Sequence, residues 1–231
     1  MKIGLFADPH YSSSEQTGRN RRNRASLQKL LKAYSHFTAA GCSLAVCLGD
    51  LIDHEPTTEL VLENLSAVAE IIANAPMKTV ALMGNHDAFA LTPEQFYGTL
   101  GLPFPSTLSL DGRRLVFLDS CYFSHGRHYA PGDSNWKDAF LPNTEALAAE
   151  LALSHEDTYL FLHHVLDPAV RADHCLSNAD TVRTIIRNGG TVKAVFQGHF
   201  HEGARAVYDG VDYITLPAMC ENENAYFVFE I

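Results

Sequence analysis

Segment 198–201, which reads GHFH, places two histidines one residue apart directly after the apolar run 192–197. Four other apolar runs are also followed within a few residues by carboxylate, imidazole or amide side chains. The side chains at these five places are Asp8, His10, Asp50, Asp53, Asn85, His86, Asp87, His163, His164, His199 and His201. Carboxylate, imidazole and amide ligands together suit divalent Mn, Fe or Zn, whereas a structural thiolate zinc site would need cysteines. These residues therefore predict a divalent-metal centre.

The size of this set indicates more than one ion. Seven or more ligands are too many for one such ion, whereas two ions about 3.5–4 Å apart can share a carboxylate, as in two-metal hydrolases. No motif is informative alone, because an isolated D-x-H or H-x-H occurs often by chance and GNHD, at 84–87, has the composition of a turn. All five motifs in one chain, each after an apolar run, predict a two-metal site.

The apolar runs that precede these residues are typical of β-strands. They are short, rich in β-branched or aromatic residues, and bounded by polar or glycine positions. We expect strands at 2–7, 43–48, 78–83, 114–119, 158–163 and 192–197. Helical stretches separate them, and this alternation predicts an α/β fold with parallel central strands. The carboxyl ends of such strands share one edge, where ligands bind, so the five segments should converge.

Helical periodicity indicates the elements between these strands. Apolar side chains recur on one helical face in 27–37 and again in 61–72. Later helices are predicted at 143–151, with Asn143 as N-cap, and at 178–190, which ends in two glycines.

The remaining segments lack such a period. The tail 211–231 contains two strand patterns joined by a polar turn, which predicts an antiparallel pair that closes the sheets. Segment 121–140 predicts a long loop that serves the site, with His125 and His128 lining the cleft. Residues 173–175 follow the His163 strand in an irregular segment that could contact the substrate, but an ordinary exposed loop is the favoured interpretation.

Length and composition limit the class of protein. The chain has 231 residues, 46% of them apolar, which is enough for one sizeable core and predicts a single domain, 1–231. A formal net charge of −10 argues against general nucleic-acid binding and against an anionic membrane as partner. No apolar run has membrane-spanning length, and the N-terminus reads as a strand rather than a signal peptide. Five cysteines, an odd number, indicate reduced thiols and a cytoplasmic protein.

At these residues the sequence resembles the calcineurin-like metallophosphoesterase superfamily. Its pattern is D-x-H, G-D-x-x-D, G-N-H-D/E, a later His and G-H-x-H, and all five blocks are present between residues 8 and 201. The resemblance implies two packed mixed β-sheets flanked by helices, in a four-layer α/β/β/α sandwich. It implies one metal ion held by Asp8, His10, Asp50 and His201. It implies a second held by Asp50, Asn85, His163 and His199.

Two positions stay open on the residues alone. Either His163 or His164 could be the ligand, because successive strand residues face opposite sides. The family places its ligand first after the strand, which favours His163 and leaves His164 nearby, either supporting the ligands or contacting the substrate. Asp53 reads as a helix cap or as an acceptor beside the ligands. Purple acid phosphatases have a ligating Tyr at that position, so the chain should lie outside that subgroup.

The resemblance also implies a mechanism. Two cations would lower the pKa of a bridging water and supply a hydroxide that attacks phosphorus. His86 follows ligand Asn85 without belonging to the ligand set, so we expect it to act as the general acid or to stabilise the oxyanion, with Asp87 fixing its tautomer.

The substrate class is less constrained. Arg21 and Arg22 lie in the arginine-rich segment 17–24, which is explained equally well by binding of substrate phosphate and by a solvated helix start. The ends of the chain are similar in arrangement to bacterial phosphodiesterases and to manganese-dependent ADP-ribose and CDP-alcohol diphosphatases. We expect a phosphodiesterase or pyrophosphatase for a small nucleotide-like substrate. The alternatives are a phosphomonoesterase, a nuclease, or a non-catalytic metal-binding scaffold for protein interactions.

Overall fold

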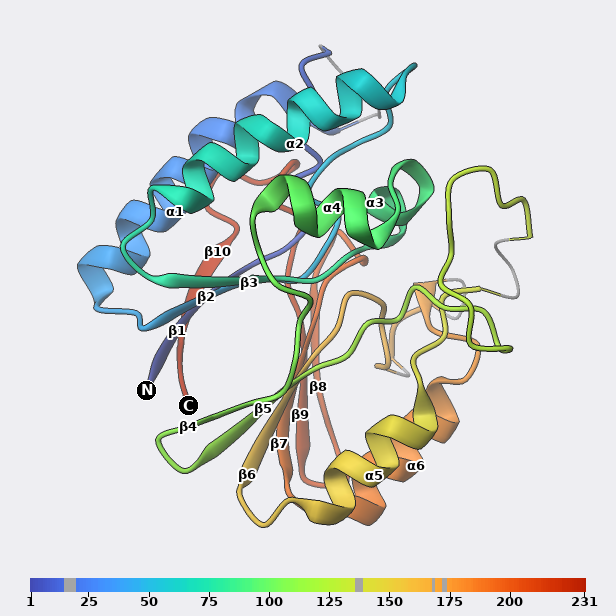
Figure 1. Cartoon of the computed structure of the whole chain (residues 1–231). Helices are drawn as coiled ribbons and strands as arrows, with labels where there is room; N and C mark the ends of the chain where they lie inside the picture. The colour runs from blue at the N-terminus through green and yellow to red at the C-terminus, as the bar shows by residue number, and fades with distance from the viewer. Residues whose placement is uncertain (15–19, 136–138, 168, 172–173) are drawn as a thin grey trace.

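The computed structural model describes residues 1–14, 20–135, 139–167, 169–171 and 174–231, and these form two β-sheets packed face to face (Figure 1). The first sheet has the order β10-β1-β2-β3. Its strands are β10 (Tyr226–Glu230), β1 (Lys2–Phe6), β2 (Leu44–Cys47) and β3 (Lys78–Ala81). Strands β1, β2 and β3 are parallel, and β10 runs antiparallel beside β1. The sheet is therefore mixed.

The second sheet is also mixed and has the order β4-β5-β6-β7-β9-β8. Its strands are β4 (Leu108–Leu110), β5 (Arg113–Phe117), β6 (Asp157–Phe161), β7 (Val192–Gln197), β9 (Val211–Thr215) and β8 (Ala204–Tyr208). The four inner strands are parallel, whereas β4 and β8 pair antiparallel at the two edges. All parallel strands of the sheet thus present their carboxyl ends to one side.

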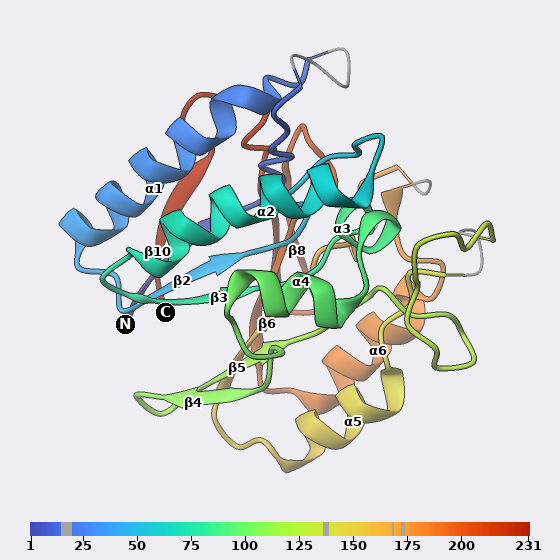
Figure 2. The same ribbon diagram turned by 45° about the horizontal axis from the view of Figure 1, so that its top comes forward.

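Helices cover the outer faces of both sheets (Figures 1 and 2). On the first sheet lie α1 (Ser26–Ala40) and α2 (Thr58–Ala73), with α4 (Pro93–Leu100) beside α2. The short helices η1 (Asn23–Ala25) and α3 (Asn85–Ala90) precede α1 and α4. On the second sheet lie α5 (Thr144–Leu153) and α6 (Ala179–Gly189), which pack on each other. The predicted four-layer α/β/β/α arrangement is confirmed.

A layer of apolar side chains joins the two sheets. Leu5 and Val46 of the first sheet belong to the same buried cluster as three phenylalanines of the second. The rings of Phe117, Phe161 and Phe196 stack in series, with centroid separations of 5.0 and 5.2 Å. Burial of this apolar area, at about 25 cal/mol per Å², holds the sheets in a fixed relation. The strand ends of both sheets are therefore rigidly placed beside one another.

The six strands predicted at 2–7, 43–48, 78–83, 114–119, 158–163 and 192–197 appear as β1, β2, β3, β5, β6 and β7. The four predicted helices appear as α1, α2, α5 and α6, and the backbone N–H of Ala146 donates to Asn143 Oδ1 at 2.9 Å, as expected of an N-cap. None of the helices in the described ranges combines the length and the apolar character needed to cross a bilayer.

The prediction for the tail is wrong. Strands β9 and β10 do not pair with each other: β9 joins β7 and β8, whereas β10 joins β1 in the other sheet. The physical reason is that each strand completes a different sheet, and a sequence pattern of alternating apolar residues does not specify its partner. The connection 216–225 consequently crosses from the second sheet to the first. It brings Cys220 and Glu221 to the carboxyl ends of the strands, where the backbone N–H of Cys220 donates to the Asp8 carbonyl.

Candidate active site

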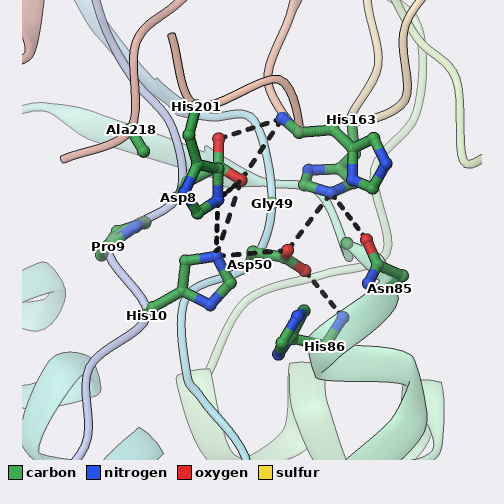
Figure 3. Close-up of polar contacts among 12 residues, drawn as sticks. Asp8, Pro9, His10, Gly49, Asp50, Asn85, His86, His163, His201 and Ala218 are labelled. Atoms are coloured by element: carbon green, nitrogen blue, oxygen red, sulfur yellow. Dashed lines mark hydrogen bonds and ion pairs between the residues drawn. The ribbon is translucent and has the colours of Figure 1, made fainter. Parts of the chain in front are cut away.

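The chemistry-bearing side chains gather where the strands of the two sheets end. Figure 3 shows the side chains of Asp8, His10, Asp50, His163 and His201 pointing toward one another from loops that are far apart in the sequence. Asp8 and His10 follow β1, Asp50 follows β2, and the two other histidines follow β6 and β7. The predicted convergence of these strand-end segments is therefore found in the structure.

Four side chains form what we term the first ligand group: Asp8, His10, Asp50 and His201. His10 Nε2 lies 3.2 Å from His201 Nε2, 3.5 Å from Asp50 Oδ2 and 3.8 Å from Asp8 Oδ1. His201 Nε2 lies 3.6 Å from Asp8 Oδ1. Two carboxylate oxygens and two imidazole nitrogens thus surround one point, which is a donor set that suits a divalent transition metal.

The second ligand group consists of Asp50, Asn85, His163 and His199. His163 Nε2 lies 3.2 Å from Asn85 Oδ1 and 3.4 Å from Asp50 Oδ2. The ring of His199 lies 5.1 Å from that of His163, and their ligand atoms are within 4.8 Å of each other. Asp50 Oδ2 lies within 3.5 Å of a histidine nitrogen in each group, so this carboxylate could serve as a ligand in both.

Hydrogen bonds at the far side of two of these rings, those of His163 and His201, select the nitrogen that faces the centre. His163 Nδ1 donates to the Leu48 carbonyl at 2.8 Å, and His201 Nδ1 donates to Glu221 Oε1 at 2.7 Å. When such a ring is neutral, its proton stays on Nδ1 and Nε2 presents a lone pair, which is the arrangement that metal-binding histidines use. Imidazole nitrogens and carboxylate oxygens that face one another 3.2–3.5 Å apart fit a pair of cations. The residues present therefore match two divalent metals.

Backbone conformation at the ligands supports a functional role. Asp8, His10, Asp50 and His199 have φ values of 53°, 43°, 53° and 66°, in the left-handed region. A non-glycine residue held there costs on the order of 1–3 kcal/mol, and such residues cluster at active sites. Gly84 is needed for a different reason, because a Cβ at this position would lie 2.1 Å from Asp50 Oδ1. The fold thus accepts local strain to aim these side chains.

Burial and neighbouring charges together shift the pKa values of this cluster. Burial raises the pKa of Asp50, but the charges of His163 and His86 outweigh it and hold that pKa well below its ordinary value. Burial lowers the pKa of His163, but Asp50 raises it to about 9. His199 shows the reverse, because burial and the charge of His163 lower its pKa to about 3. A cation must displace the His163 proton from Nε2, so metal affinity should rise with pH.

His86 lies beside this cluster, with its ring against Asp53. His86 Nδ1 lies 2.9 Å from Asp53 Oδ1, and the Asp53 carboxylate also accepts from Arg21 Nη1 and Asn23 Nδ2, each at 2.9 Å. Burial lowers the pKa of His86, but the carboxylates of Asp50 and Asp53 outweigh burial and raise it. The imidazolium form of His86 is therefore favoured. Asp53 is an acceptor beside the ligands, whereas Thr57 caps α2.

The expectation that Asp87 fixes the His86 tautomer is wrong. The fully buried Asp87 carboxylate instead accepts from the backbone N–H groups of Gly84, Ile52 and Leu51, at 2.9, 3.2 and 3.3 Å. Burial and the charge of Asp50 raise the pKa of Asp87 to about 7. Asp87 therefore ties the loop after β2 to the start of α3. The acceptor beside the His86 ring is Asp53, because the loop after β2 brings the Asp53 carboxylate to His86 Nδ1.

The geometry separates His163 from His164. His164 Nδ1 lies 2.7 Å from Ser120 Oγ, and its ring packs against those of His199 and Phe140, with centroids 4.8 and 4.9 Å away. His164 is 5% exposed, and burial together with the charges of His199 and His163 holds its pKa well below the ordinary value. It supports the ring of His199, and it is not among the described residues that line the cavity over the two ligand groups.

A cavity of about 360 Å³ opens over both ligand groups. It is lined by Arg21, Asp50, Asn85, His86, Arg171, His174, His199, Phe200, His201, Glu202 and Glu221. Arg21 is thus placed at the site, whereas Arg22 is not among the described residues that line it. The Arg22 side chain is 67% exposed and pairs with Glu223 at 2.8 Å.

Sequence reasoning missed several of the cavity residues. Arg171 and Glu221 carried no recognisable motif, and Phe200 could have been suspected only from its place inside GHFH. His174 lines the cavity although an exposed loop was expected, and Asp173 lies outside the described residues. These residues reach the site through long connections, whose course is set by packing rather than by local pattern.

The prediction that 121–140 lines the metal cleft is not supported by the cavity that the described residues form. His125 lines two separate cavities, of about 560 and 600 Å³, and His128 Nε2 pairs with Asp119 at 3.2 Å. Residues 136–138 of this segment lie outside the described part. Among the described residues of this loop, Phe140 contacts the ring of His164, and both Phe140 and Tyr129 contact Phe89, which lies against His86.

Residues 1–203 match the calcineurin-like phosphoesterase family. A probable cyclic nucleotide phosphodiesterase of Rhodococcus erythropolis is 26% identical over 206 residues, which cover 85% of this chain and 64% of that protein. A cAMP/cGMP dual specificity phosphodiesterase of Mycobacterium tuberculosis is 29% identical over 189 residues, covering 78% of this chain and 55% of the relative. The chain thus spans less than two thirds of the length of either relative.

Solved structures show the same fold. A dimetal phosphatase from Danio rerio superposes with a TM-score of 0.84 at 20% identity, covering 98% of this chain and 91% of that one. TT1561 of Thermus thermophilus superposes with a TM-score of 0.65 at 12% identity, covering 95% of this chain and 90% of the other. The match to the family covers all five strand-end motifs that build the two ligand groups. This chain is a member of the calcineurin-like phosphoesterase family.

Proposed function

We propose that the protein is a binuclear metal-dependent phosphoester hydrolase that cleaves a phosphodiester or pyrophosphate bond in a small, nucleotide-like molecule. The observation that carries this proposal is the position of Asp50, whose Oδ2 lies 3.5 Å from His10 Nε2 and 3.4 Å from His163 Nε2. A carboxylate shared by two ligand groups is the arrangement of two-metal phosphoester hydrolases. The first and second ligand groups would each hold one ion, of Mn, Fe or Zn.

The mechanism divides the work between the cations and the side chains around them. When bound, two divalent cations would lower the pKa of a shared water and neutralise the charge of the phosphate oxygens. His86, kept protonated by Asp50 and Asp53, donates its proton to the leaving alkoxide. Asp53 fixes the ring through Nδ1, which leaves Nε2 as the donor. Asp87 acts indirectly, because it positions the backbone of the loop after β2 at Ile52 and the backbone before α3 at Gly84.

The cavity and the charge of the chain support a small substrate. A cavity of about 360 Å³ is at the lower end of the range of small-molecule sites, about 300–1,000 Å³. The formal net charge of −10 disfavours a nucleic-acid substrate, which would be repelled over its whole length. The two relatives described as cyclic nucleotide phosphodiesterases support a nucleotide-like diester. We also place the protein in the cytoplasm, because its five cysteines are free thiols.

Two other functions fit the fold. A phosphomonoesterase would use the same two ligand groups, and it would be distinguished by a preference for monoesters over diesters. A metal-binding scaffold without activity would not need His86, whose contact with Asp53 at 2.9 Å has no purpose in a purely structural metal site. The intact His86–Asp53 pair therefore favours an enzyme.

The test is metal-dependent hydrolysis. The protein is stripped with a chelator, reloaded singly with Mn, Fe, Zn, Ni or Mg, and assayed on bis-p-nitrophenyl phosphate, p-nitrophenyl phosphate, cyclic nucleotides and nucleoside diphosphate esters. Activity on a diester or pyrophosphate that returns with two ions per chain is the expected result. Two bound ions without hydrolysis of any of these substrates would contradict the proposal and favour the scaffold.

Arg21 and Arg22 offer a matched pair for testing the substrate contact. Replacing Arg21 with Met should raise KM by about tenfold with little loss of bound metal, because a guanidinium at the cavity wall pairs with phosphate oxygens. Replacing Arg22 with Met should leave KM unchanged, since its side chain is 67% exposed and faces Glu223. Steady-state kinetics with metal analysis check both variants. An equal rise of KM in both would show that the effect is general electrostatics.

The Asp53→Asn variant tests the ionisation of His86. Asp53 raises the pKa of His86, so removal of its charge should lower that pKa and deprotonate His86 at a lower pH. A general acid is active below its pKa and is lost as pH rises through it. The basic limb of the kcat profile should therefore move to lower pH. A profile that keeps its basic limb at the wild-type pH would exclude His86 as the titrating acid.

A further inference from the structure

A carboxylate outside the strand-end motifs contacts one histidine of the first ligand group. Glu221 Oε1 accepts from His201 Nδ1 at 2.7 Å, and its side chain is 26% exposed. A carboxylate at Nδ1 fixes the tautomer of a metal-binding histidine and increases the basicity of Nε2. We propose that Glu221 is a positioning residue that sets the metal affinity of the first ligand group and leaves that of the second nearly untouched. This inference rests on the proposed two-metal site.

The segment that carries Glu221 is held from the opposite side by a buried lysine. Lys29, on α1, is 2% exposed, and its Nζ donates to the carbonyl of Met219 at 2.8 Å and to that of Cys220 at 3.3 Å. A buried ammonium between two carbonyls keeps the backbone in one position, because loss of these contacts would leave a charge unsatisfied. The backbone that carries Glu221 is therefore held in place, and contact of Glu221 with His201 does not require a flexible segment to become ordered.

The same segment also holds the strand end that supplies Asp8. The backbone N–H of Met219 donates to the Ala7 carbonyl at 2.9 Å, and that of Cys220 donates to the Asp8 carbonyl at 3.0 Å. The backbone N–H of Ala218 donates to the His201 carbonyl at 3.0 Å. Residues 218–221 thus connect Asp8 with His201, two members of the first ligand group. Figure 3 shows Ala218 beside these side chains.

The second ligand group has a different support. His163 Nδ1 donates to the Leu48 carbonyl, a neutral acceptor, at 2.8 Å. A carboxylate stabilises a metal-bound imidazole more strongly than a carbonyl does, because its full charge acts through the ring. The two groups therefore differ in a feature that mutation can remove from one of them alone. Replacing Glu221 should weaken one ion and retain the other.

The experiment compares Mn²⁺ binding to the full chain and to Glu221→Gln, using calorimetry, metal analysis and electron paramagnetic resonance. The wild type should bind two Mn²⁺ and give the spectrum of a coupled pair. The variant should lose about 10–100-fold in affinity for one ion. At Mn²⁺ concentrations that fill only the stronger site, it should hold one ion per chain and give the spectrum of an isolated Mn²⁺.

Two further variants separate position from charge. Glu223→Gln makes the same chemical change two residues away, where the carboxylate is 56% exposed and faces Arg22, and it should bind both ions as the wild type does. Glu221→Asp keeps the charge and should lose less affinity than Glu221→Gln. Circular dichroism confirms that each variant is folded. These readouts do not depend on turnover of any substrate.

Three results would overturn the inference: wild-type affinity in Glu221→Gln, equal weakening of both ions, or the same loss in Glu223→Gln. Failure of the proposed function has a different signature, since a wild-type protein that binds two coupled ions but hydrolyses no phosphoester contradicts only the catalytic proposal. A wild type that binds one ion would contradict both.

Discussion

Replacing Asp50 with Asn is expected to remove both metal ions and to lower kcat by at least about 10³-fold, the scale of losing a principal electrostatic stabiliser. Asp50 Oδ2 contacts His10 of the first ligand group and His163 of the second, so one substitution affects both. The amide keeps the size of the side chain but lacks its charge and has only one oxygen. Metal content per chain and kcat, measured on the same preparation, check this prediction.

Asp212, near the start of β9 in the second sheet, provides a matched control for Asp50→Asn. Asp212, on β9, pairs with Arg205 at 2.6 Å and does not contact either ligand group, so Asp212→Asn should retain two ions and full turnover. His201→Ala should weaken the first group while one ion remains in the second. If Asp50→Asn lost only one ion, the carboxylate would not be a bridge and the two-metal arrangement would have to be revised.

Replacing His86 with Ala is expected to leave both ions bound while kcat falls by about 10²–10⁴-fold, the usual contribution of a general acid. The His86 side chain bonds with Asp53, and its ring lies edge-on to that of His10, with centroids 4.6 Å apart. Its hydrogen bond to the ligand groups comes from the backbone N–H, which donates to Asp50 Oδ1 at 2.8 Å. Alanine preserves that backbone donor. Metal analysis and steady-state kinetics therefore separate catalysis from binding, with Asn85→Ala as the comparison that should lose metal.

The leaving group provides a second readout for His86. An activated leaving group such as p-nitrophenolate departs without a proton, whereas an alkoxide needs one. The kcat of His86→Ala should consequently fall far less on bis-p-nitrophenyl phosphate than on an alkyl diester. A loss of the same size on both substrates, or a loss of metal equal to that in Asn85→Ala, would remove His86 from the role of acid.

Local pattern was sufficient for most of the fold. The six apolar runs at 2–7 through 192–197 became six strands, because a short run rich in β-branched and aromatic residues fits the interior of a parallel sheet. The α5 helix begins at its predicted N-cap, Asn143, whose side chain bonds with Ala146 only three residues away. Interactions of this kind join residues only a few positions apart, so they can be predicted without knowing the tertiary structure.

Pairing between distant strands was not accessible in the same way. Strands β9 and β10 carry similar alternation, yet they entered different sheets. The edge strands β4 and β8 were not anticipated, since edge strands are half exposed and their pattern is weaker. The choice of partner depends on which face is already covered by another element, which is a property of the assembled layers.

In the candidate site, too, some features follow from local sequence and others depend on contacts between distant residues. By itself the sequence determined which residue types meet at the strand ends, because the carboxyl ends of parallel strands share one edge and the motifs follow those ends directly. Only the tertiary structure decided which neighbour each of them contacts: Asp53 rather than Asp87 at His86, and Glu221 at His201 across 20 positions of the chain. The reason is physical, since a ring is oriented by whichever acceptor packing brings within 3 Å, and sequence spacing carries no information about that distance.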